Sequence, residues 1–288
     1  MFVPWKDPRI EEPTITSSFL LLKPDCLRQA LTGEAERVIA GLGLTIEERR
    51  TVTLTPAGVR VLWPEYSDDG HVLARAFLDR YLTSGPSEVV VVSGEDAYEK
   101  CRLAKRELRG RYAIGVFANV VHAAESRSEL ARQMAYLLGG VTAAAEVRQR
   151  PRGMDFRAVI DIPALVDELW PLLQQDLRPP PPHRTDASGT WALILGGDRD
   201  HTLDSTVTAL WQAFPGIDPA RAVLLALYAD RTGGYPIATG SRRSMVRAGK
   251  ALKKHGIRHC WTVSAPPEPV PATSAAPPGR AAGTPSPR

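Results

Sequence analysis

The chain has 288 residues, of which 43% are hydrophobic and 24% are charged, and its formal net charge at pH 7 is +4. This length and composition allow two packed domains, and the small basic excess suits an anionic substrate without marking a nucleic-acid surface. The three cysteines lie far apart, and no run of eighteen apolar residues occurs. We therefore expect a cytoplasmic protein that has no zinc site or disulfide framework and does not act on nucleic acid or at a membrane.

The first part of the chain alternates strand and helix patterns. Residues 1–16 contain three prolines and are expected to form an irregular arm. Residues 19–22 are a continuous apolar run, typical of a strand buried on both faces. The sequence Lys23-Pro24-Asp25 ends this strand. A helix over residues 34–42 and a strand over residues 44–54 are predicted to follow.

Two further helices are predicted over residues 56–66 and 71–82, the first with Thr55 as its N-cap. A β-branched run over residues 88–92 predicts a strand, and a helix is expected over residues 94–108. The order β-α-β, helices, β-α-β predicts an α+β domain with the ferredoxin-like (split βαβ) topology.

The stretch from residue 108 to residue 126 carries the most informative polar side chains. An apolar segment, residues 112–117, runs into a turn that presents Asn119 and His122, and Arg109 precedes it. A helix over residues 128–138 is expected to follow. A single histidine after a strand is often only packed or solvent-facing, so its meaning depends on the motifs elsewhere in the chain.

Those motifs resemble the nucleoside diphosphate kinase family over residues 17–138. Lys-Pro-Asp follows the first strand, Ser-Gly-Pro precedes a middle strand, Arg-Gly stands ahead of the last core strand, and Asn-Val-Val-His completes the set. The resemblance implies ATP as the phosphate donor, Mg²⁺ bridging its phosphates, and His122 as the nucleophile. It also implies nucleotide contacts from Lys23, Tyr66, Arg109 and Asn119.

The chain departs from that family at several positions. Ala123-Ala124 stands in place of Gly-Ser, Gln133 in place of the glutamate that orients the histidine, and Ala74 near the base-stacking aromatic residue. Glu129 is a candidate substitute for the orienting glutamate. The connection before Arg109 is shorter than in the family and leaves out a phosphate-binding residue. Arg102 or Arg106 is expected to take the place of that residue.

The middle of the chain reads as a connection between two domains. Residues 141–178 are interpreted as an extension that docks on the first domain, with a strand over residues 156–162 and a helix over residues 164–177. Four consecutive prolines favour a semi-rigid linker over residues 179–188. The tail, residues 265–288, has almost no large apolar residue and is predicted to be disordered.

Residues 189–264 predict a second, smaller α/β domain. Strands are expected at residues 191–195 and 259–263, and helices at residues 202–214, 219–229 and 244–255, with a short strand after a Gly-Gly turn. The order is therefore strand, helix, helix, strand, helix, strand.

This pattern resembles the ClpS family, whose members bind peptides through a free N-terminal residue. The resemblance implies that Asp198 and Asp230 hold an α-ammonium group, and that Leu203, Ala226 and Ala229 line an apolar slot. The family's asparagine falls on Gly197 in this chain. An alternative stays open in which Asp198 is only a turn residue and Asp230 only a surface residue.

Three functions are compatible with these motifs. The favoured hypothesis is an ATP-dependent kinase whose second domain presents a small peptide or other amine, so that the product is a phosphoramidate. The alternatives are a nucleoside diphosphate kinase that works through phosphohistidine, and a non-enzymatic adaptor for N-terminal residues. The favoured hypothesis requires the slot to face His122 within one chain or across a homo-oligomer.

Overall fold

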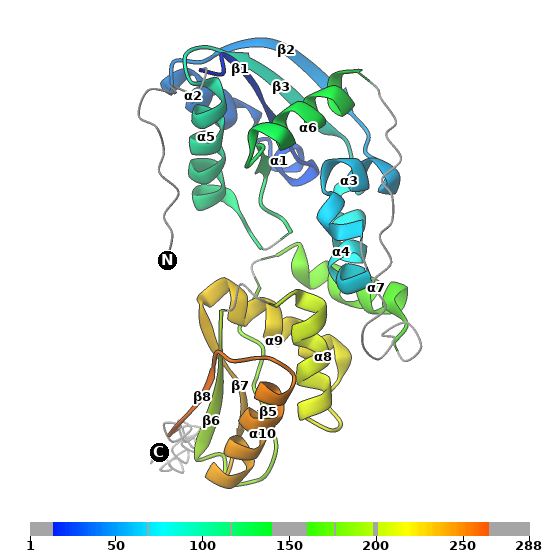
Figure 1. Cartoon of the computed structure of the whole chain (residues 1–288), viewed down its shortest axis with the longest axis vertical. Coiled ribbons are helices and arrows are strands. Elements are labelled where there is room, and N and C mark those ends of the chain that lie inside the picture. The colour runs from blue at the N-terminus through cyan, green and yellow to red at the C-terminus, as the bar shows by residue number, and fades with distance from the viewer. Residues whose placement is uncertain are drawn as a thin grey trace, which may run out of the picture.

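The computed structural model describes residues 14–67, 69–115, 117–139, 160–175, 177–197 and 201–264. Two α/β units lie one above the other along the long axis, and helices α4 (Val72–Leu82) and α7 (Ile162–Leu173) lie between them (Figure 1). The predicted arm before residue 14 and the predicted tail after residue 264 fall outside the described residues.

The sheet of the first unit has four strands. They are β1 (Ser17–Leu22), β2 (Thr45–Val52), β3 (Ser87–Ser93) and β4 (Val121–His122). Their order across the sheet is β2-β3-β1-β4, and every neighbouring pair is antiparallel. This is the strand order of the ferredoxin-like topology that the sequence predicted.

Helices cover both faces of this sheet, because alternate side chains of β1 point in opposite directions. Leu20 and Leu22 pack in one core with α2 (Thr32–Gly41) and α5 (Ala97–Tyr112). Phe19 and Leu21 pack in another with α3 (Pro56–Leu62) and α6 (Arg127–Gly139). Burial on both faces explains the continuous apolar run.

The predicted helix over residues 56–66 is shorter than expected. The Thr55 side chain does cap its start by accepting a hydrogen bond from the Gly58 N–H at 3.1 Å. The α-helix ends at Leu62, and a 3-10 turn, η1 (Pro64–Ser67), follows it. Pro64 lacks an N–H and disfavours helical backbone at Trp63, which explains the break. The short turn η2 (Asp69–His71) then leads into α4.

Helix α5 is longer than the sequence predicted. It continues through Arg109 to Tyr112, and the strand that follows it in the described residues is β4. Basic side chains in a last helical turn are favoured by the helix dipole. Arg109 and Arg111 occupy that turn, and Arg111 pairs with Glu107 one turn earlier, 2.7 Å away.

The second unit has the element order that its sequence pattern predicted. Its strands are β5 (His183–Arg184), β6 (Trp191–Gly196), β7 (Gly234–Gly240) and β8 (Cys260–Ser264), and its helices are α8 (Leu203–Ala213), α9 (Pro219–Thr232) and α10 (Arg242–Lys254). The strand order is β5-β7-β6-β8. Since β5 pairs with β7, this sheet includes residues that the sequence placed in the linker.

Helix α7 joins the two units. Asp161 caps its start, and it ends at Leu173 rather than at residue 177. The helix includes Ile162, so the end of the strand predicted over residues 156–162 is wrong, and residues 156–159 lie outside the described residues. Leu73 and Phe77 of α4 belong to one apolar cluster with α7 and the second unit. The units therefore share a core.

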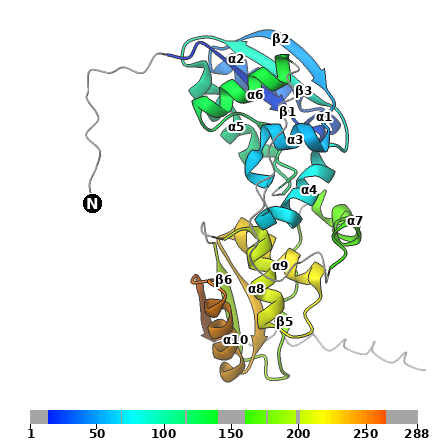
Figure 2. The same ribbon diagram turned by 45° about the vertical axis from the view of Figure 1, so that its right-hand side comes forward.

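A polar clamp adds to this shared core. The N-cap of α4, His71, offers no capping side chain. Instead the buried Asp204 of α8 accepts hydrogen bonds from the backbone N–H groups of Leu73 at 2.7 Å and Ala74 at 3.1 Å. The Thr202 hydroxyl donates to the Gly70 carbonyl at 3.1 Å. The second unit thus satisfies the free N–H groups of a helix of the first, and Figure 2 shows α4 above α8 and α9.

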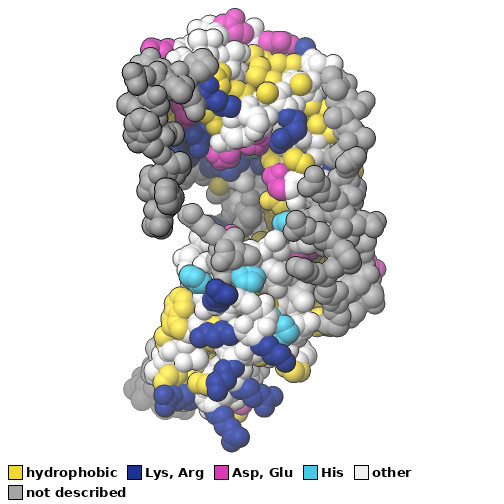
Figure 3. Space-filling view, viewed as in Figure 1, with side chains coloured by type: hydrophobic (Ala, Val, Ile, Leu, Met, Phe, Trp, Pro, Cys, Tyr) yellow, Lys and Arg dark blue, Asp and Glu magenta, His cyan; other side chains and the backbone are white. Residues whose placement is uncertain are grey.

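The outer surface of the second unit is basic. Helix α10 carries exposed cationic side chains and no acidic one. They are Arg242, Arg243, Arg247, Lys250, Lys253 and Lys254. Figure 3 shows Lys and Arg gathered on this part of the surface. In the described part of the chain, no helix has the length and apolar character needed to cross a bilayer.

Candidate active site

The Lys-Pro-Asp turn positions the residues before β4. The Lys23 N–H donates to the Val120 carbonyl at 2.8 Å, and the Val120 N–H donates to Asp25 Oδ2 at 2.9 Å. The Tyr81 hydroxyl donates to the other oxygen of Asp25. Val120 has a φ of 57°, a strained conformation for a β-branched residue. These bonds hold the strained turn in place, with Asn119 and His122 on either side of it.

His122 is held in a defined tautomer. Its Nε2 atom lies 2.9 Å from Gln133 Oε1, and both residues are buried. The Gln133 amide nitrogen donates to the Leu62 carbonyl and to Glu129, each at 2.8 Å, so the amide oxygen must face the ring. An oxygen accepts, and Nε2 therefore carries the proton while Nδ1 keeps its lone pair. Burial lowers the pKa of His122, which favours the neutral ring.

Glu129 lies beside this pair, as its position one turn from Gln133 suggested. Its Oε1 atom is 3.5 Å from His122 Nε2, and its Oε2 accepts from the Glu125 N–H at 2.8 Å. Although partial burial raises the pKa of Glu129, the contacts with His122 and the Glu125 N–H bring it to about 2. The carboxylate is therefore charged near the ring, where it favours a developing imidazolium.

Lys23 and Arg109 place positive charge near the histidine. The buried Lys23 ammonium donates to Asn119 Oδ1 at 2.5 Å, and Arg109 Nε donates to the Val121 carbonyl at 2.9 Å. Burial, followed by the charge of Arg109, lowers the pKa of Lys23 to about 7. An anion that enters the site stabilises the protonated, positively charged form of Lys23.

Lys105 is a third cation of this site and is itself buried, and the sequence analysis missed it. Its ammonium donates to the Ala123 carbonyl at 2.8 Å and pairs with Glu125. The sequence feature that could have indicated Lys105 is its position four residues before Arg109, which places both side chains on the same face of α5. Arg102 pairs with Glu99 and Glu125 outside the cavity lining, and Arg106 is exposed.

These side chains surround a cavity of about 410 Å³, here called the histidine cavity. Its lining residues are Lys23, Trp63, Glu65, Tyr66, Leu78, Lys105, Arg109, Phe117, Asn119, His122, Glu125 and Glu129. The volume lies in the range of small-molecule sites. Three carboxylates share this lining with three cations and a neutral histidine, and the cations offer several contacts to a ligand that carries several negative charges.

Comparison with known proteins agrees with this geometry. Residues 16–141 match the family model for nucleoside diphosphate kinase. The nucleoside diphosphate kinase of Methanosarcina mazei is 32% identical over 131 residues, which cover 41% of this chain and 84% of that protein. This chain belongs to the nucleoside diphosphate kinase family.

Two further relatives extend the comparison. The nucleoside diphosphate kinase of Desulfovibrio desulfuricans is 30% identical over 138 residues, covering 43% of this chain and 95% of that protein. A solved NDP kinase from Pyrobaculum aerophilum is 22% identical, with a TM-score of 0.36, and the match covers 43% of this chain and 95% of that one. The family model's match ends at residue 141, so the resemblance of the second unit to ClpS stays a prediction.

A second cavity, of about 390 Å³, lies between the units and is here called the interdomain cavity. Four residues predicted for an acceptor slot line it, namely Leu203, Ala226, Ala229 and Asp230. Asp198 lies outside the described residues. The sequence did not predict that the first unit supplies part of the lining, which includes Glu65, Tyr66, His71, Ala74 and Phe117.

Tyr66, for which the resemblance implies a nucleotide contact, lies between the histidine cavity and the interdomain cavity. It is half-buried, lines both cavities, and stacks edge-on against His71 with ring centroids 5.5 Å apart. The ring nearest His122 belongs to Trp63, at 4.9 Å between centroids. No group of three or more His, Cys, Asp or Glu within the described ranges is arranged to hold a metal ion.

Proposed function

We propose that this protein is a nucleoside-triphosphate-dependent phosphotransferase in which His122 Nδ1 takes the γ-phosphoryl group. The observation that carries the proposal is the bond between His122 Nε2 and Gln133 Oε1, which leaves the lone pair on Nδ1. A neutral imidazole nitrogen is a competent nucleophile, and the phosphoramidate it forms passes the group on readily.

The residues of the histidine cavity suit each change in this step. The Nδ1 lone pair attacks the γ-phosphorus, a P–N bond forms, and the bond to the bridging oxygen breaks with its electrons going to the leaving diphosphate. Lys23, Lys105 and Arg109 contribute positive charge near the phosphate groups. Enzymes accelerate phosphoryl transfer mainly by positioning the reactants and by stabilising negative charge, so these three side chains suit the reaction. The Nε2–H faces Gln133 and Glu129, which stabilise the positive ring.

Magnesium fits this site as part of the nucleotide complex. Mg²⁺ is usually held by substrate phosphates and one or two carboxylates, and the carboxylates of Glu125 and Glu129 line the histidine cavity. When bound, the ion would neutralise charge on the phosphate oxygens.

The finer proposal concerns the acceptor. We infer a small peptide or amino-acid-like amine presented by the second unit, which would yield a phosphoramidate. The predicted slot residues line a cavity that also has lining residues from the kinase-like unit. The second candidate is a nucleoside diphosphate acceptor, favoured by the matched family. An adaptor without activity is disfavoured because Lys23, Arg109, Asn119 and His122 share one cavity.

Labelling tests the first half of this reaction. The full chain is incubated with γ-labelled ATP and Mg²⁺, separated from nucleotide, and treated with acid or base. We expect label on the protein that acid removes and base does not, as for phosphohistidine. Turnover without any labelled protein intermediate would overturn the covalent route, and the absence of both would overturn the proposed function.

A further inference from the structure

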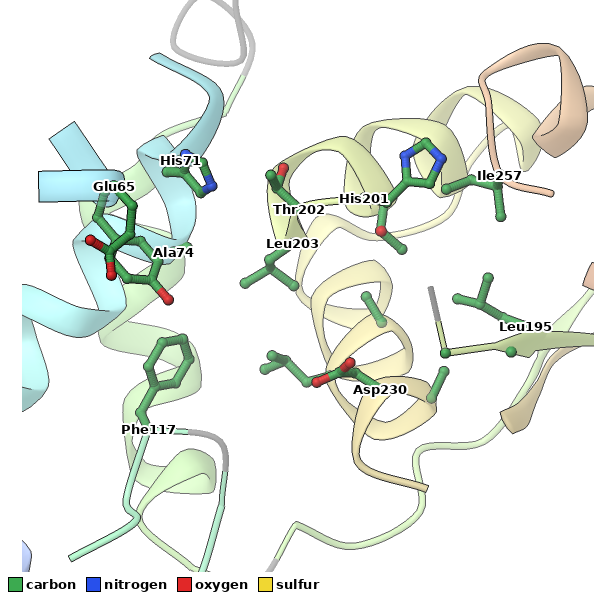
Figure 4. Close-up of a pocket in the computed structure, with 17 residues that line it drawn as sticks. Glu65, His71, Ala74, Phe117, Leu195, His201, Thr202, Leu203, Asp230 and Ile257 are labelled. Carbon is green, nitrogen blue, oxygen red and sulfur yellow. The ribbon is translucent and has the colours of Figure 1, made fainter. Parts of the chain in front are cut away.

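The two cavities share three lining residues. Glu65, Tyr66 and Phe117 line the histidine cavity and the interdomain cavity alike. Figure 4 shows Glu65, Ala74 and Phe117 on the wall given by the first unit, facing Leu203 and Asp230 on the wall given by the second. A ligand in the interdomain cavity therefore lies next to the phosphoryl-transfer site.

The chemistry of the interdomain cavity differs from that of its neighbour. Among its described lining residues none is Lys or Arg, and two are carboxylates, Glu65 and Asp230. Apolar surface comes from Leu203, Ala226 and Leu227, among others. Phosphate groups of a second nucleotide would meet two carboxylates here without a balancing Lys or Arg, whereas an ammonium group on an apolar body would be stabilised.

The walls of this cavity are fixed relative to each other. The Asp204 clamp joins α8 to the start of α4, and Ala74, one of the clamped residues, also lines the cavity. The shared apolar cluster holds the same two elements together. A volume of about 390 Å³ between fixed walls suits a small molecule such as a dipeptide.

We propose that the interdomain cavity is the acceptor site, that its ligand is a small primary amine with an apolar body, and that Glu65 binds the ammonium group and removes its proton. This inference rests on the proposed function, because it needs the phosphoryl group on His122. Glu65 is the residue of choice because it is the one carboxylate among the described linings that both cavities share.

The surroundings of Glu65 suit a base. Part of the residue is exposed, which lets a ligand reach it, while partial burial of the carboxyl and then the nearby Glu129 charge raise its pKa. A carboxylate with a raised pKa is a better proton acceptor than an ordinary one. Asp230, on the opposite wall, adds a second negative charge toward the ammonium group.

The transfer step then balances as follows. The ammonium group gives one proton to the Glu65 carboxylate and becomes a neutral amine. The amine lone pair attacks phosphorus, the new N–P bond forms, and the P–Nδ1 bond breaks with its electrons returning to Nδ1. The second proton leaves the new phosphoramidate nitrogen for solvent, and the Glu65 carboxyl also releases its proton to solvent.

The experiment separates the two halves of the reaction. Labelled full-length phosphoenzyme, free of nucleotide, is mixed with leucyl-alanine, N-acetyl-leucyl-alanine or ADP, and label transfer is timed. We expect rapid transfer to leucyl-alanine and none to its acetylated form. Equal transfer to both peptides, or transfer to ADP alone, would overturn the inference. Failure to form phosphoenzyme at all would instead count against the proposed function.

Variants then test Glu65 itself. Glu65→Gln is expected to slow transfer to leucyl-alanine at least about 100-fold more than it slows labelling by ATP, since a positioned base contributes roughly 10²–10⁴-fold. The matched control is Glu168→Gln, an exposed carboxylate on α7 that lines neither cavity. A variant that still becomes labelled by ATP is folded. Equal rates of transfer from labelled Glu65→Gln and labelled Glu168→Gln to leucyl-alanine would therefore show that Glu65 does not act in the transfer step.

A second variant tests the cavity independently of Glu65. Ala226→Leu adds bulk to a buried lining residue. It should raise the KM for leucyl-alanine at least about tenfold, because small changes in an apolar pocket alter substrate discrimination by about tenfold or more. The KM for ATP in the labelling step should stay nearly the same. An unchanged KM for the dipeptide would place the acceptor elsewhere.

Discussion

The histidine cavity and the interdomain cavity are nearly equal in volume and differ in their cations. The first contains three cations, Lys23, Lys105 and Arg109, and the second has carboxylates and no described Lys or Arg. The two share a short boundary of three residues. Lys and Arg side chains on one side of the boundary, and carboxylates without a described Lys or Arg on the other, favour different ligands, a polyanion and an amine, while keeping their reacting atoms close.

The two cavities are also built differently. The histidine cavity is formed within one unit, around a turn held by the Lys-Pro-Asp motif. The interdomain cavity needs both units, and the hydrogen bonds that hold its walls together join residues about 130 positions apart. A change in the histidine cavity should therefore affect ATP binding or chemistry, while a change at the clamp should affect stability and the binding of the acceptor.

The largest effect that sharpens this comparison is expected at His122. His122→Ala removes the nucleophile and should lower turnover by on the order of 10⁴-fold or more, as the removal of a nucleophile does in other enzymes. Binding of ATP should persist, because the three cations remain. Steady-state rates with leucyl-alanine and with ADP, together with calorimetry of ATP binding, measure both. A variant that keeps near wild-type turnover with either acceptor would contradict the assignment.

The next effect tests whether the charge of the histidine cavity comes from Lys105. Lys105→Met should weaken ATP binding about 10- to 100-fold, since a hydrogen bond to a charged group contributes roughly 1.5–3 kcal/mol. Arg106→Met is the matched control, because Arg106 is the exposed neighbour on α5. If calorimetry shows that the affinity for ATP changes equally in both variants, Lys105 does not contact the phosphate groups.

The contrast between Lys105 and Arg106 shows how far the sequence could predict this site. The resemblance of the short motifs to those of the nucleoside diphosphate kinase family implied that Lys23, Asn119 and His122 belong to one site, and each motif is short enough to be read in the sequence. Lys105 was not predicted as a site residue, because the helix that carries it was expected to end at residue 108, before Arg109. Once α5 continues to Tyr112, Lys105 and Arg109 lie on one face of one helix.

The fold was predictable where periodicity is local and less so where partners are distant. The strand pattern predicted the first sheet, and the helix and strand order of the second unit was also anticipated. The interdomain cavity was not, because the approach of α4 to α8 depends on Asp204, which looks like any acidic residue in a first helical turn. Glu65 likewise has no local motif.

A third prediction concerns pH and the histidine cavity. The pKa of Lys23 is about 7 in the free protein, so above pH 7 its ammonium loses its proton. Bound phosphates favour the charged form and raise that pKa, so ATP binding above pH 7 must be accompanied by proton uptake. The affinity for ATP should therefore fall by up to about tenfold per pH unit between pH 7 and the bound pKa.

Calorimetry in two buffers of different ionisation enthalpy measures that uptake directly. Lys23→Arg is the control, because a guanidinium stays charged throughout this range, and its ATP affinity should change little between pH 7 and pH 9. A wild-type affinity that is equally flat would show that Lys23 keeps its proton in the free protein.

The smallest expected effect tests whether the interdomain cavity depends on the clamp. Both oxygens of Asp204 accept a backbone N–H, from Leu73 and from Ala74, so Asp204→Asn turns an amide N–H₂ toward a donor. We expect a decrease of about 1–2 kcal/mol in the free energy of unfolding and a few-fold rise in the KM for leucyl-alanine, with little change for ATP. Asp218→Asn is the control: Asp218 caps α9 within its own unit with one oxygen, and Asn caps helices as well as Asp. Thermal unfolding and the KM values for leucyl-alanine and ATP are measured for both variants. Equal changes in the KM for leucyl-alanine in the two variants would mean that the clamp only adds stability and does not shape the acceptor site.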